Sequence, residues 1–194
     1  MIEEQKSRAK PKFTMIAIPV ALLFVIVIPL SVYFVGKWMD TLLSFPLFPP
    51  FPLNCIIGPV IIGLGFGIAL GSIYQLYKSG LGLPWGPIKR EVESTQLITT
   101  GLYAYTRNPM VLGFIILLSG IGWFTQSITA IIVIPFFVFI VLYIWLAFKE
   151  EHQMEEKFGS DYLSYKSRTP RIFPRPWRRR IKKNNEKTGT EEEK

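Results

Sequence analysis

This sequence has very little cysteine and histidine, and its long apolar runs contain no charged residue. Among 194 residues, Cys55 is the single cysteine and His152 the single histidine. A disulfide scaffold is therefore excluded, and a zinc site has too few ligands of the usual kinds. No Ser-His-Asp or Cys-His arrangement suggests a hydrolase. We expect Cys55 to be a buried small side chain and His152 an exposed helical residue.

Long apolar runs dominate what is present, since 49% of the residues are apolar and only 19% are charged. Three runs without any charge have 23, 22 and 39 residues, against the roughly 20 that cross a bilayer core: 13–35, 56–77 and 110–148. A soluble globular domain is excluded. An ion channel or proton-coupled transporter is disfavoured, because either would need ionisable groups within the spans.

The distribution of positive charge predicts the topology. Four basic residues precede the first run, which is longer than a signal core and has no small-x-small cleavage site, so we expect a retained span. Only Lys37 is basic between the first two runs, whereas Lys78, Lys89, Arg90 and Arg107 lie in the next connection. By the positive-inside rule the first loop is outside and the second is cytoplasmic.

The 39-residue run is too long for one crossing and predicts a helical hairpin. Its turn is expected within 119–127, where small and polar residues collect. Nine of the 18 residues of 166–183 are basic and none is acidic, which favours a cytoplasmic tail. The sequence thus predicts an all-α integral membrane protein with four crossings and both termini in the cytoplasm. A Pro-rich segment at 41–53 allows a fifth membrane-associated piece.

The second run carries glycine at every fourth position: Gly63, Gly67 and Gly71. Such spacing lines one helical face with residues that let another backbone approach closely. We expect this face to pack against a neighbouring helix, with a ligand-facing groove as the alternative.

Two groups of polar residues stand at the cytoplasmic ends of the hairpin. Asn108 followed by Pro109 has the form of a helix N-cap with proline at the first helical position. The first amides of that helix, with its dipole and Arg107, suit a carboxylate or phosphate. The second group, 149–158, begins with Lys149, Glu150 and Glu151 and continues as a helix to a stop at Gly159.

Because a hairpin brings its two ends together, Arg107 and Asn108 are expected to face Glu150 and Glu151. An anion-binding helix start beside two carboxylates is complementary to a zwitterion, so an amino-acid-like ligand fits. Each part alone has a plainer interpretation: Arg107 as a topology determinant, and the glutamates as a solvated helix face. Only the combination favours a functional site.

The same residues carry a family resemblance. The sequence Gly-Leu-Tyr-Ala-Tyr-Thr-Arg-Asn-Pro at 101–109, Glu150-Glu151, the block 158–165 and Pro-Arg-Ile-Phe-Pro at 170–174 follow one another in order and at suitable spacing. They resemble the isoprenylcysteine carboxyl methyltransferases and the related phospholipid methyltransferases, in a short prokaryotic or archaeal version.

The resemblance implies an integral membrane methyltransferase that uses S-adenosylmethionine and acts on a lipophilic or prenylated-cysteine acceptor. It implies that Glu150 holds the ammonium of the cofactor. Arg107 is our own candidate for orienting a carboxylate, either that of the acceptor or that of the cofactor, so we expect Arg107 and Glu150 to serve catalysis. The block from Gly159 to Tyr165 and the following Pro-Arg segment would cap the cofactor. The implied cofactor contacts are Gln96, Leu97, Ile98, Tyr103, Asn108, Pro109, Met110, Val111, Glu150 and Glu151.

Two departures from the family pattern concern the chemistry. Asn108 stands where the family usually has histidine, and an amide cannot be a titrating base. Leu146 stands where isoprenylcysteine enzymes have a substrate-contacting arginine. Alternatives therefore stay open: methylation of a phospholipid headgroup amine, a sterol-reductase-like enzyme that uses NADPH, and a membrane scaffold without activity.

The expected organisation has four parts: a basic cytoplasmic N-terminus at 1–12, N-terminal spans and a cytoplasmic connection at 13–93, a catalytic core at 94–176, and a basic, partly disordered tail at 177–194. We expect a multi-pass location in the membrane, and neither a metal nor a nucleic acid as partner.

Overall fold

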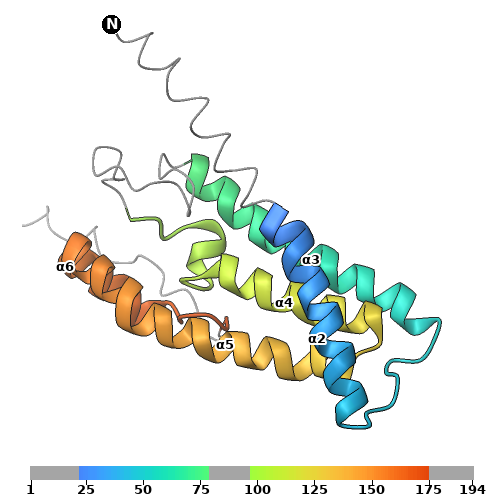
Figure 1. Cartoon of the computed structure of the whole chain (residues 1–194). Coiled ribbons are helices and arrows are strands. Elements are labelled where there is room, and N and C mark those ends of the chain that lie inside the picture. The colour runs from blue at the N-terminus through green and yellow to red at the C-terminus, as the bar shows by residue number, and fades with distance from the viewer. Residues whose placement is uncertain (1–21, 79–96, 175–194) are drawn as a thin grey trace, which may run out of the picture.

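The computed structural model describes residues 22–78 and 97–174, and in these ranges the chain is helical and forms no strand. Figure 1 shows the helices lying side by side in a bundle. Four short elements differ from the α-helix: η1, η4 and η5 are π-helical and η3 is a 3-10 turn. In chain order the elements are η1 Leu23–Val27, α2 Ile28–Leu42, α3 Leu53–Lys78, η3 Gly101–Ala104, α4 Pro109–Thr125, η4 Thr129–Val133, α5 Ile134–Trp145, η5 Leu146–Glu150 and α6 Glu151–Arg168.

Two stretches are long and apolar enough to cross a membrane, Leu53–Leu76 and Thr129–Arg168, while the apolar helix Pro109–Thr125 is shorter. The predicted all-helical character is thus confirmed for the described residues. Four or five crossings remain a prediction, because the start of the first run lies outside the described residues. The same holds for the predicted boundaries of the four parts, each of which falls at an undescribed position.

Helices α3 and α4 pack closely, but not through the predicted glycine face. A Cβ atom added to Gly65 would lie 2.6 Å from the Gly113 carbonyl oxygen, and one added to Gly113 would lie 2.7 Å from the Ala69 nitrogen. Space is open beside Gly63 and Gly67. The prediction was therefore wrong for these two positions. Small residues lie on two faces of α3, one with Gly63 and Gly67 and the other with Gly65 and Ala69. The small residues of α4 pack against the second face.

The predicted hairpin is present, and its turn, at 126–127, lies at the end of the expected range. Helix α4 continues through Thr125, and Gln126 ends it in the left-handed conformation with φ 55°. The residues Ser119 and Gly122 are helical and serve packing instead. The Ser119 hydroxyl donates to the Ile131 carbonyl at 2.8 Å, and a Cβ at Gly122 would lie 2.4 Å from the Ala130 backbone. Small residues thus bring the two arms together rather than forming the turn.

The second arm continues from α5 through η5 into α6, which forms the orange rod in Figure 1. Gly159 was predicted to end this helix. Its φ of 51° and ψ of −124° are not helical and do interrupt the helix, but a second helical stretch follows directly and runs as far as Arg168. The chain then folds back, and Ile172, only 2% exposed, packs with Ile115 and Leu146. This return places 160–174 beside the start of α4.

Candidate functional site

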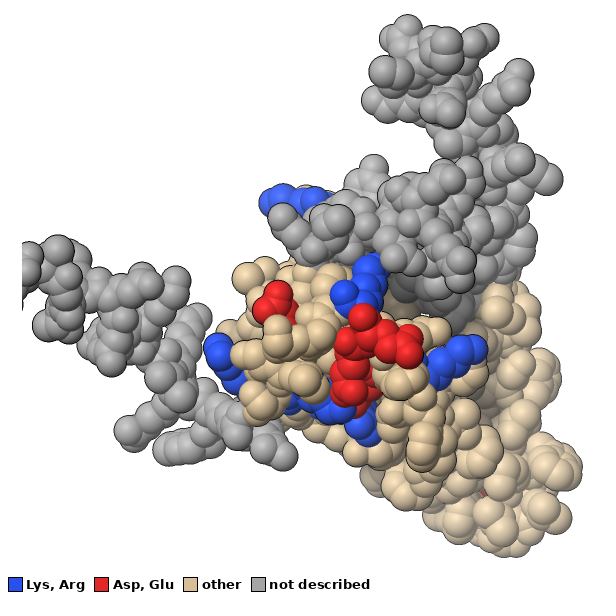
Figure 2. Space-filling model, turned by 90° about the vertical axis from the view of Figure 1, so that its left-hand side faces the viewer, with Lys and Arg blue, Asp and Glu red and all other residues tan. Residues whose placement is uncertain are grey.

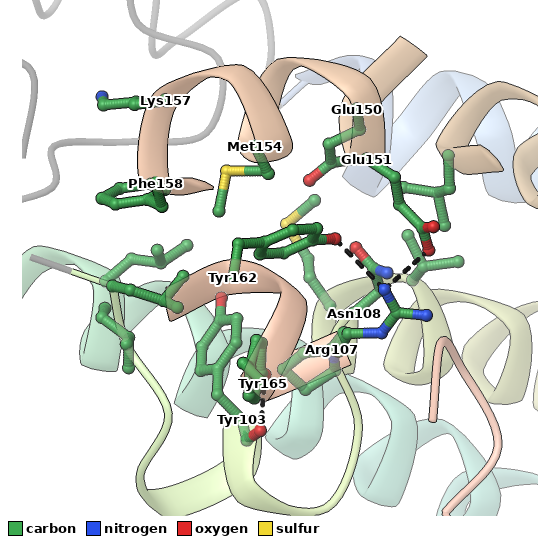
Figure 3. Close-up of a pocket in the computed structure, with 17 residues that line it drawn as sticks. Tyr103, Arg107, Asn108, Glu150, Glu151, Met154, Lys157, Phe158, Tyr162 and Tyr165 are labelled. Carbon is green, nitrogen blue, oxygen red and sulfur yellow. Dashed lines mark hydrogen bonds and ion pairs between the residues drawn. The ribbon is translucent and has the colours of Figure 1, made fainter. Parts of the chain in front are cut away.

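A pocket of about 300 Å³ lies between the start of α4 and the two halves of α6 (Figure 3). Glu150, Met154 and Phe158 reach it from one side and Tyr103 and Asn108 from another, while Tyr162 and Tyr165 come from the second half of α6. It is lined by Leu76, Leu97, Ile98, Tyr103, Arg107, Asn108, Pro109, Met110, Val111, Leu146, Glu150, Glu151, Met154, Lys157, Phe158, Tyr162 and Tyr165. The volume is at the lower end of the range for small-molecule sites.

The pocket brings together the residues that the sequence singled out. Those that line it are Leu97, Ile98, Tyr103, Arg107, Asn108, Pro109, Met110, Val111, Glu150 and Glu151. Gln96 lies outside the described residues. The two ends of the hairpin are therefore neighbours, as expected, whereas the roles assigned to these residues remain predictions.

Several lining residues were not predicted as contacts. Leu76 comes from α3, and Met154, Lys157 and Phe158 come from the first half of α6, while Tyr162 and Tyr165 come from the block expected to form the cap. A signal for part of this set was present in the sequence. Leu146, Glu150, Met154 and Phe158 are spaced by four, which places them along one face of a helix. Leu76 had no such signal, because it contributes from a different helix.

The first turn of α4 explains the placement of Asn108. This residue occupies the N-cap position and Pro109 the first helical position, as predicted, but the Asn108 side chain does not cap the helix. Its amide donates instead to the Arg171 carbonyl at 3.1 Å. The first intrahelical bond is Leu112 N–H to the Asn108 carbonyl at 3.1 Å. The amides of Met110 and Val111 thus precede the helical ladder at the pocket wall.

Glu151 is surrounded by positive charge. Its carboxylate lies 2.9 Å from Arg107 Nη1 and 3.0 Å from Lys166 Nζ, and Arg171 donates to it through two nitrogens. The Glu151 side chain is only 5% exposed and that of Arg107 only 8%. Hydrogen bonding to Glu151 raises the pKa of Arg171, which keeps its guanidinium charged. Glu151 is therefore a neutralised centre of a buried ion-pair network.

Glu150 differs from its neighbour. Within the described part of the chain the ion pairs near the pocket end on Glu151 or Glu155, and none involves Glu150. In Figure 3 its carboxylate points into the space that Tyr162 and Met154 border, whereas Glu151 points toward Arg107. The Glu150 carboxylate remains open to a positively charged ligand.

Arg107 has capacity for a further acceptor. Its Nη1 donates to the Tyr162 hydroxyl at 3.2 Å as well as pairing with Glu151. Its buried Nε has no hydrogen-bond partner among the described residues. A buried unpaired donor of a guanidinium carries a free-energy cost that an anionic ligand would remove.

The residues after Gly159 form a wall held by backbone contacts. The Arg107 N–H donates to the Pro170 carbonyl at 2.9 Å, and the Thr106 hydroxyl donates to the Arg171 carbonyl at 3.2 Å. The Tyr165 hydroxyl donates to the Tyr103 carbonyl at 2.6 Å. These bonds tie 160–174 to the loop that leads into α4.

Tyr103 is fixed from the side of α3. The Leu102 N–H donates to Gln75 Oε1 at 3.1 Å, and the Tyr103 and Ser72 hydroxyls are 2.9 Å apart. Burial raises the pKa of Tyr103 and the nearby Glu150 raises it further, against the opposing effect of the bond to Ser72. The phenol is therefore neutral at physiological pH.

Charged side chains gather at the end of the molecule that contains the pocket. Figure 2 shows acidic side chains in one cluster with basic side chains around it, next to a broad surface with little charge. Large apolar side chains are exposed along α3 and α5, among them Val60, Leu64 and Phe137. The pocket thus lies where a charged end meets apolar helices.

Comparison with known families gives the class of this chain. Residues 53–161, more than half of it, match the phospholipid methyltransferase family. The chain belongs to this family, whose members are methyltransferases. The match contains most of the pocket, from Leu76 to Phe158. Together with the two long apolar helices it indicates association with a membrane.

One curated relative gives a more distant comparison. A nickel-cobalt-cadmium resistance protein, NccN, from Alcaligenes xylosoxydans xylosoxydans is 32% identical over 83 residues. The alignment covers 43% of this chain and 38% of that protein, so the chain spans well under half of its relative.

Proposed function

We propose that this protein transfers a methyl group from S-adenosylmethionine to a lipophilic acceptor at the cytoplasmic face of a membrane. The observation that carries the proposal is one pocket with an unpaired carboxylate, Glu150, and an unpaired buried guanidinium nitrogen on Arg107. These groups are complementary to the ammonium and carboxylate of an amino acid, which is one end of this cofactor. Family membership supports the same reaction class.

The residues present fit the cofactor. Glu150 would hold its ammonium, while Arg107 and the first amides of α4 would hold its carboxylate. Leu97, Ile98 and Phe158 provide apolar and aromatic surface for the adenosine part. When bound, the cofactor supplies a methyl group already activated on a positively charged sulfur.

The chain contributes placement more than acid-base chemistry. Tyr162 and Tyr165 line the pocket beside the start of α4, where they would shield the reacting atoms from water. Holding two reactants in the reactive geometry can account for about 7–11 kcal/mol of barrier in well-oriented systems. A carboxylate acceptor is ionised at neutral pH and needs no base, which agrees with an amide at position 108.

Two acceptor chemistries remain for test. The first is the carboxylate of a prenylated cysteine, the isoprenylcysteine-type reaction. The second is the amine of a phospholipid headgroup, which the family description favours. An amine must lose a proton before it attacks, so Glu150 or Glu151 would then need a second role as the acceptor of that proton.

Calorimetry of the full-length protein in detergent tests the cofactor. We expect S-adenosylmethionine and its demethylated product, S-adenosylhomocysteine, to bind, and NADPH to give no heat. Glu150→Gln should weaken binding of the demethylated product at least tenfold, since a charged hydrogen bond is worth about 1.5–3 kcal/mol. Glu156→Gln changes the same charge on an exposed site of the same helix and should leave binding unchanged. Binding of NADPH alone would refute the proposal.

Methyl transfer then separates the acceptors. Incorporation of labelled methyl groups into a farnesylated cysteine analogue supports the carboxylate reaction, and incorporation into phosphatidylethanolamine vesicles supports the amine reaction. Rates with the amine should rise with pH as its proton is lost, while rates with the carboxylate should stay flat between about pH 6 and pH 8.

A further inference from the structure

The two adjacent glutamates of the pocket have very different surroundings. Glu150 faces the pocket without a cation partner among the described residues, while Glu151 is surrounded by Arg107, Lys166 and Arg171. A carboxylate that already receives three cations has little to offer an incoming ammonium, because its charge is balanced and its oxygens are occupied. Glu151 therefore needs a role other than direct contact.

We infer that Glu151 is a positioning residue, which orients Arg107 for the carboxylate of the ligand and clamps 160–174 over the pocket. The ligand part of this inference rests on the proposed function, whereas the clamp rests on the ion pairs alone. Among residues 22–78 and 97–174, Glu151 is the group whose ion pairs join three parts of the site: Arg107 before α4, Lys166 in the second half of α6 and Arg171 after it.

The orientation of Arg107 depends on few other contacts. Its Nη1 binds Glu151 at 2.9 Å and the Tyr162 hydroxyl at 3.2 Å, and Tyr162 itself belongs to the clamped segment. Loss of Glu151 would therefore release Arg107 from both partners. The Nε that lacks a partner would no longer be held at the pocket wall.

The clamp crosses the bend at Gly159. Glu151 and Glu155 lie before it, and Lys166 after it lies 3.0 Å from Glu151 and also pairs with Glu155. Space around Gly159 is open, so neighbouring side chains do not fix the bend. The ion pairs of Lys166 hold the two halves of α6 together, and the Tyr165 bond to the Tyr103 carbonyl ties the second half to η3.

Limited trypsin cleavage without ligand tests the clamp. With cut sites assigned by mass spectrometry, we expect Glu151→Gln to accelerate cleavage after Arg168 at least fivefold over the wild type. Glu156→Gln is the matched control and should leave that rate unchanged. Arg171→Met removes one cation of the network and does not alter the pocket lining. It should also accelerate cleavage after Arg168, and it replaces Glu151→Gln in the test if that variant does not fold. Equal rates in the wild type and in the folded variants would overturn the clamp.

Three ligands test the orientation of Arg107: S-adenosylhomocysteine, its analogue without the amino group and its analogue without the carboxylate. We expect Glu151→Gln to weaken the first two by about 10- to 100-fold and the third by less than threefold. Glu150→Gln should weaken binding of the two ligands that carry the amino group and leave binding of the analogue without it unchanged. This contrast between ligands is one that a general loss of structure cannot produce.

The other outcomes contradict the inference in distinguishable ways. If the effect of Glu151→Gln disappears with the analogue lacking the amino group, Glu151 contacts the ammonium directly. If all three ligands weaken equally, its role is structural only. If the wild type binds none of them, the proposed function fails and the ligand part falls with it, while the trypsin rates still decide the clamp.

Discussion

At the scale of single residues, the site is organised by which polar groups are already satisfied. Asn108, Arg107 and Glu151 all lie at the pocket wall, yet each has partners within the chain. Glu150 and the Arg107 Nε are the groups left for a ligand. Buried polar groups are normally paired, and Asn54 Oδ1 and Thr129 Oγ1 also lack partners among the described residues, so it is the position of Arg107 and Glu150 in the pocket lining that favours an external partner there.

The role of Asn108 can be tested by a change of one atom. Were its side chain a helix cap, Asn108→Asp would be neutral or stabilising, because a carboxylate also caps and favours the helix dipole. The amide instead donates to the Arg171 carbonyl, so aspartate would remove the donor and place a carboxylate oxygen against that carbonyl oxygen, which it repels. We expect a loss of about 1–3 kcal/mol, measured as a lower melting temperature in detergent. A stabilised variant would show that the side chain caps the helix.

Asp40, at the opposite end of the bundle, gives a prediction about pH. Burial alone would raise its pKa, but hydrogen bonds from Ser127 and Thr129 and the charge of Lys37 outweigh burial and lower it. A lowered folded-state pKa means that the stabilisation is present above about pH 4 and is lost as the pH falls further. Asp40→Asn should therefore cost about 1–3 kcal/mol at pH 7.

The control for Asp40 is the same comparison at low pH. The difference in melting temperature between the wild type and Asp40→Asn should shrink as the pH falls from 6 to 3.5. A difference that is constant over this range would mean that the charge of Asp40 contributes nothing.

The sequence identified individual site residues better than it identified their tasks. Arg107, Asn108 and Glu150 stood out because polar residues next to long apolar runs are unusual. Without the family resemblance, Glu150 and Glu151 could not be told apart, since their difference depends on Lys166 and Arg171, which reach the site only after the bend at Gly159. A fold-back of that kind leaves no periodic pattern in the sequence.

At the scale of elements, close contact between α3 and α4 supports the base of the pocket. Leu76 and the Ser72 partner of Tyr103 come from α3, while Asn108 and its neighbours begin α4. Glycines set the separation of these helices, because the backbone of the other helix occupies the space where a side chain would stand. The site geometry therefore depends on small residues that do not touch it.

Two glycines of similar appearance should respond differently to substitution. Gly113→Val would place a side chain 2.6 Å from the Gly65 carbonyl oxygen, so the helices must separate. We expect a loss of about 1–3 kcal/mol and a melting temperature lower than that of the wild type. Gly67→Val enters open space and serves as the control, with an effect within about 0.5 kcal/mol. Equal destabilisation would show that the packing face was assigned wrongly.

Hairpin connectivity was predictable, whereas the packing faces were not. A 39-residue run without charge is too long for one crossing, which fixed the existence of two arms. The turn was expected within 119–127 and lies at 126–127, but the sequence did not show that Ser119 and Gly122 serve helix contacts, because glycine and serine suit both uses. Only the position of Ile131 and Ala130 across the hairpin decides between these uses.

At the scale of the whole molecule, the pocket and the predicted topology support one another. The basic segments, the start of α4 and the charged α6 all belong to one predicted side, the cytoplasm. A water-soluble cofactor would reach the pocket from that side. A lipophilic acceptor would approach through the apolar surface of the helices, which explains why the reaction is carried out by a membrane protein.

The single cysteine makes this topology testable by labelling. In a Cys55→Ser background, Leu47→Cys lies in the loop predicted to be outside and Ser160→Cys on the cytoplasmic side, both at exposed positions. A membrane-impermeant maleimide applied to intact cells should label Leu47→Cys at once and Ser160→Cys only after permeabilisation, because the bilayer separates the second thiol from the reagent. Labelling in the reverse order would place the pocket outside and remove its access to cytosolic cofactor. Equal labelling of both thiols in intact cells would mean that the chain crosses the membrane an even number of times between them, against the three crossings predicted.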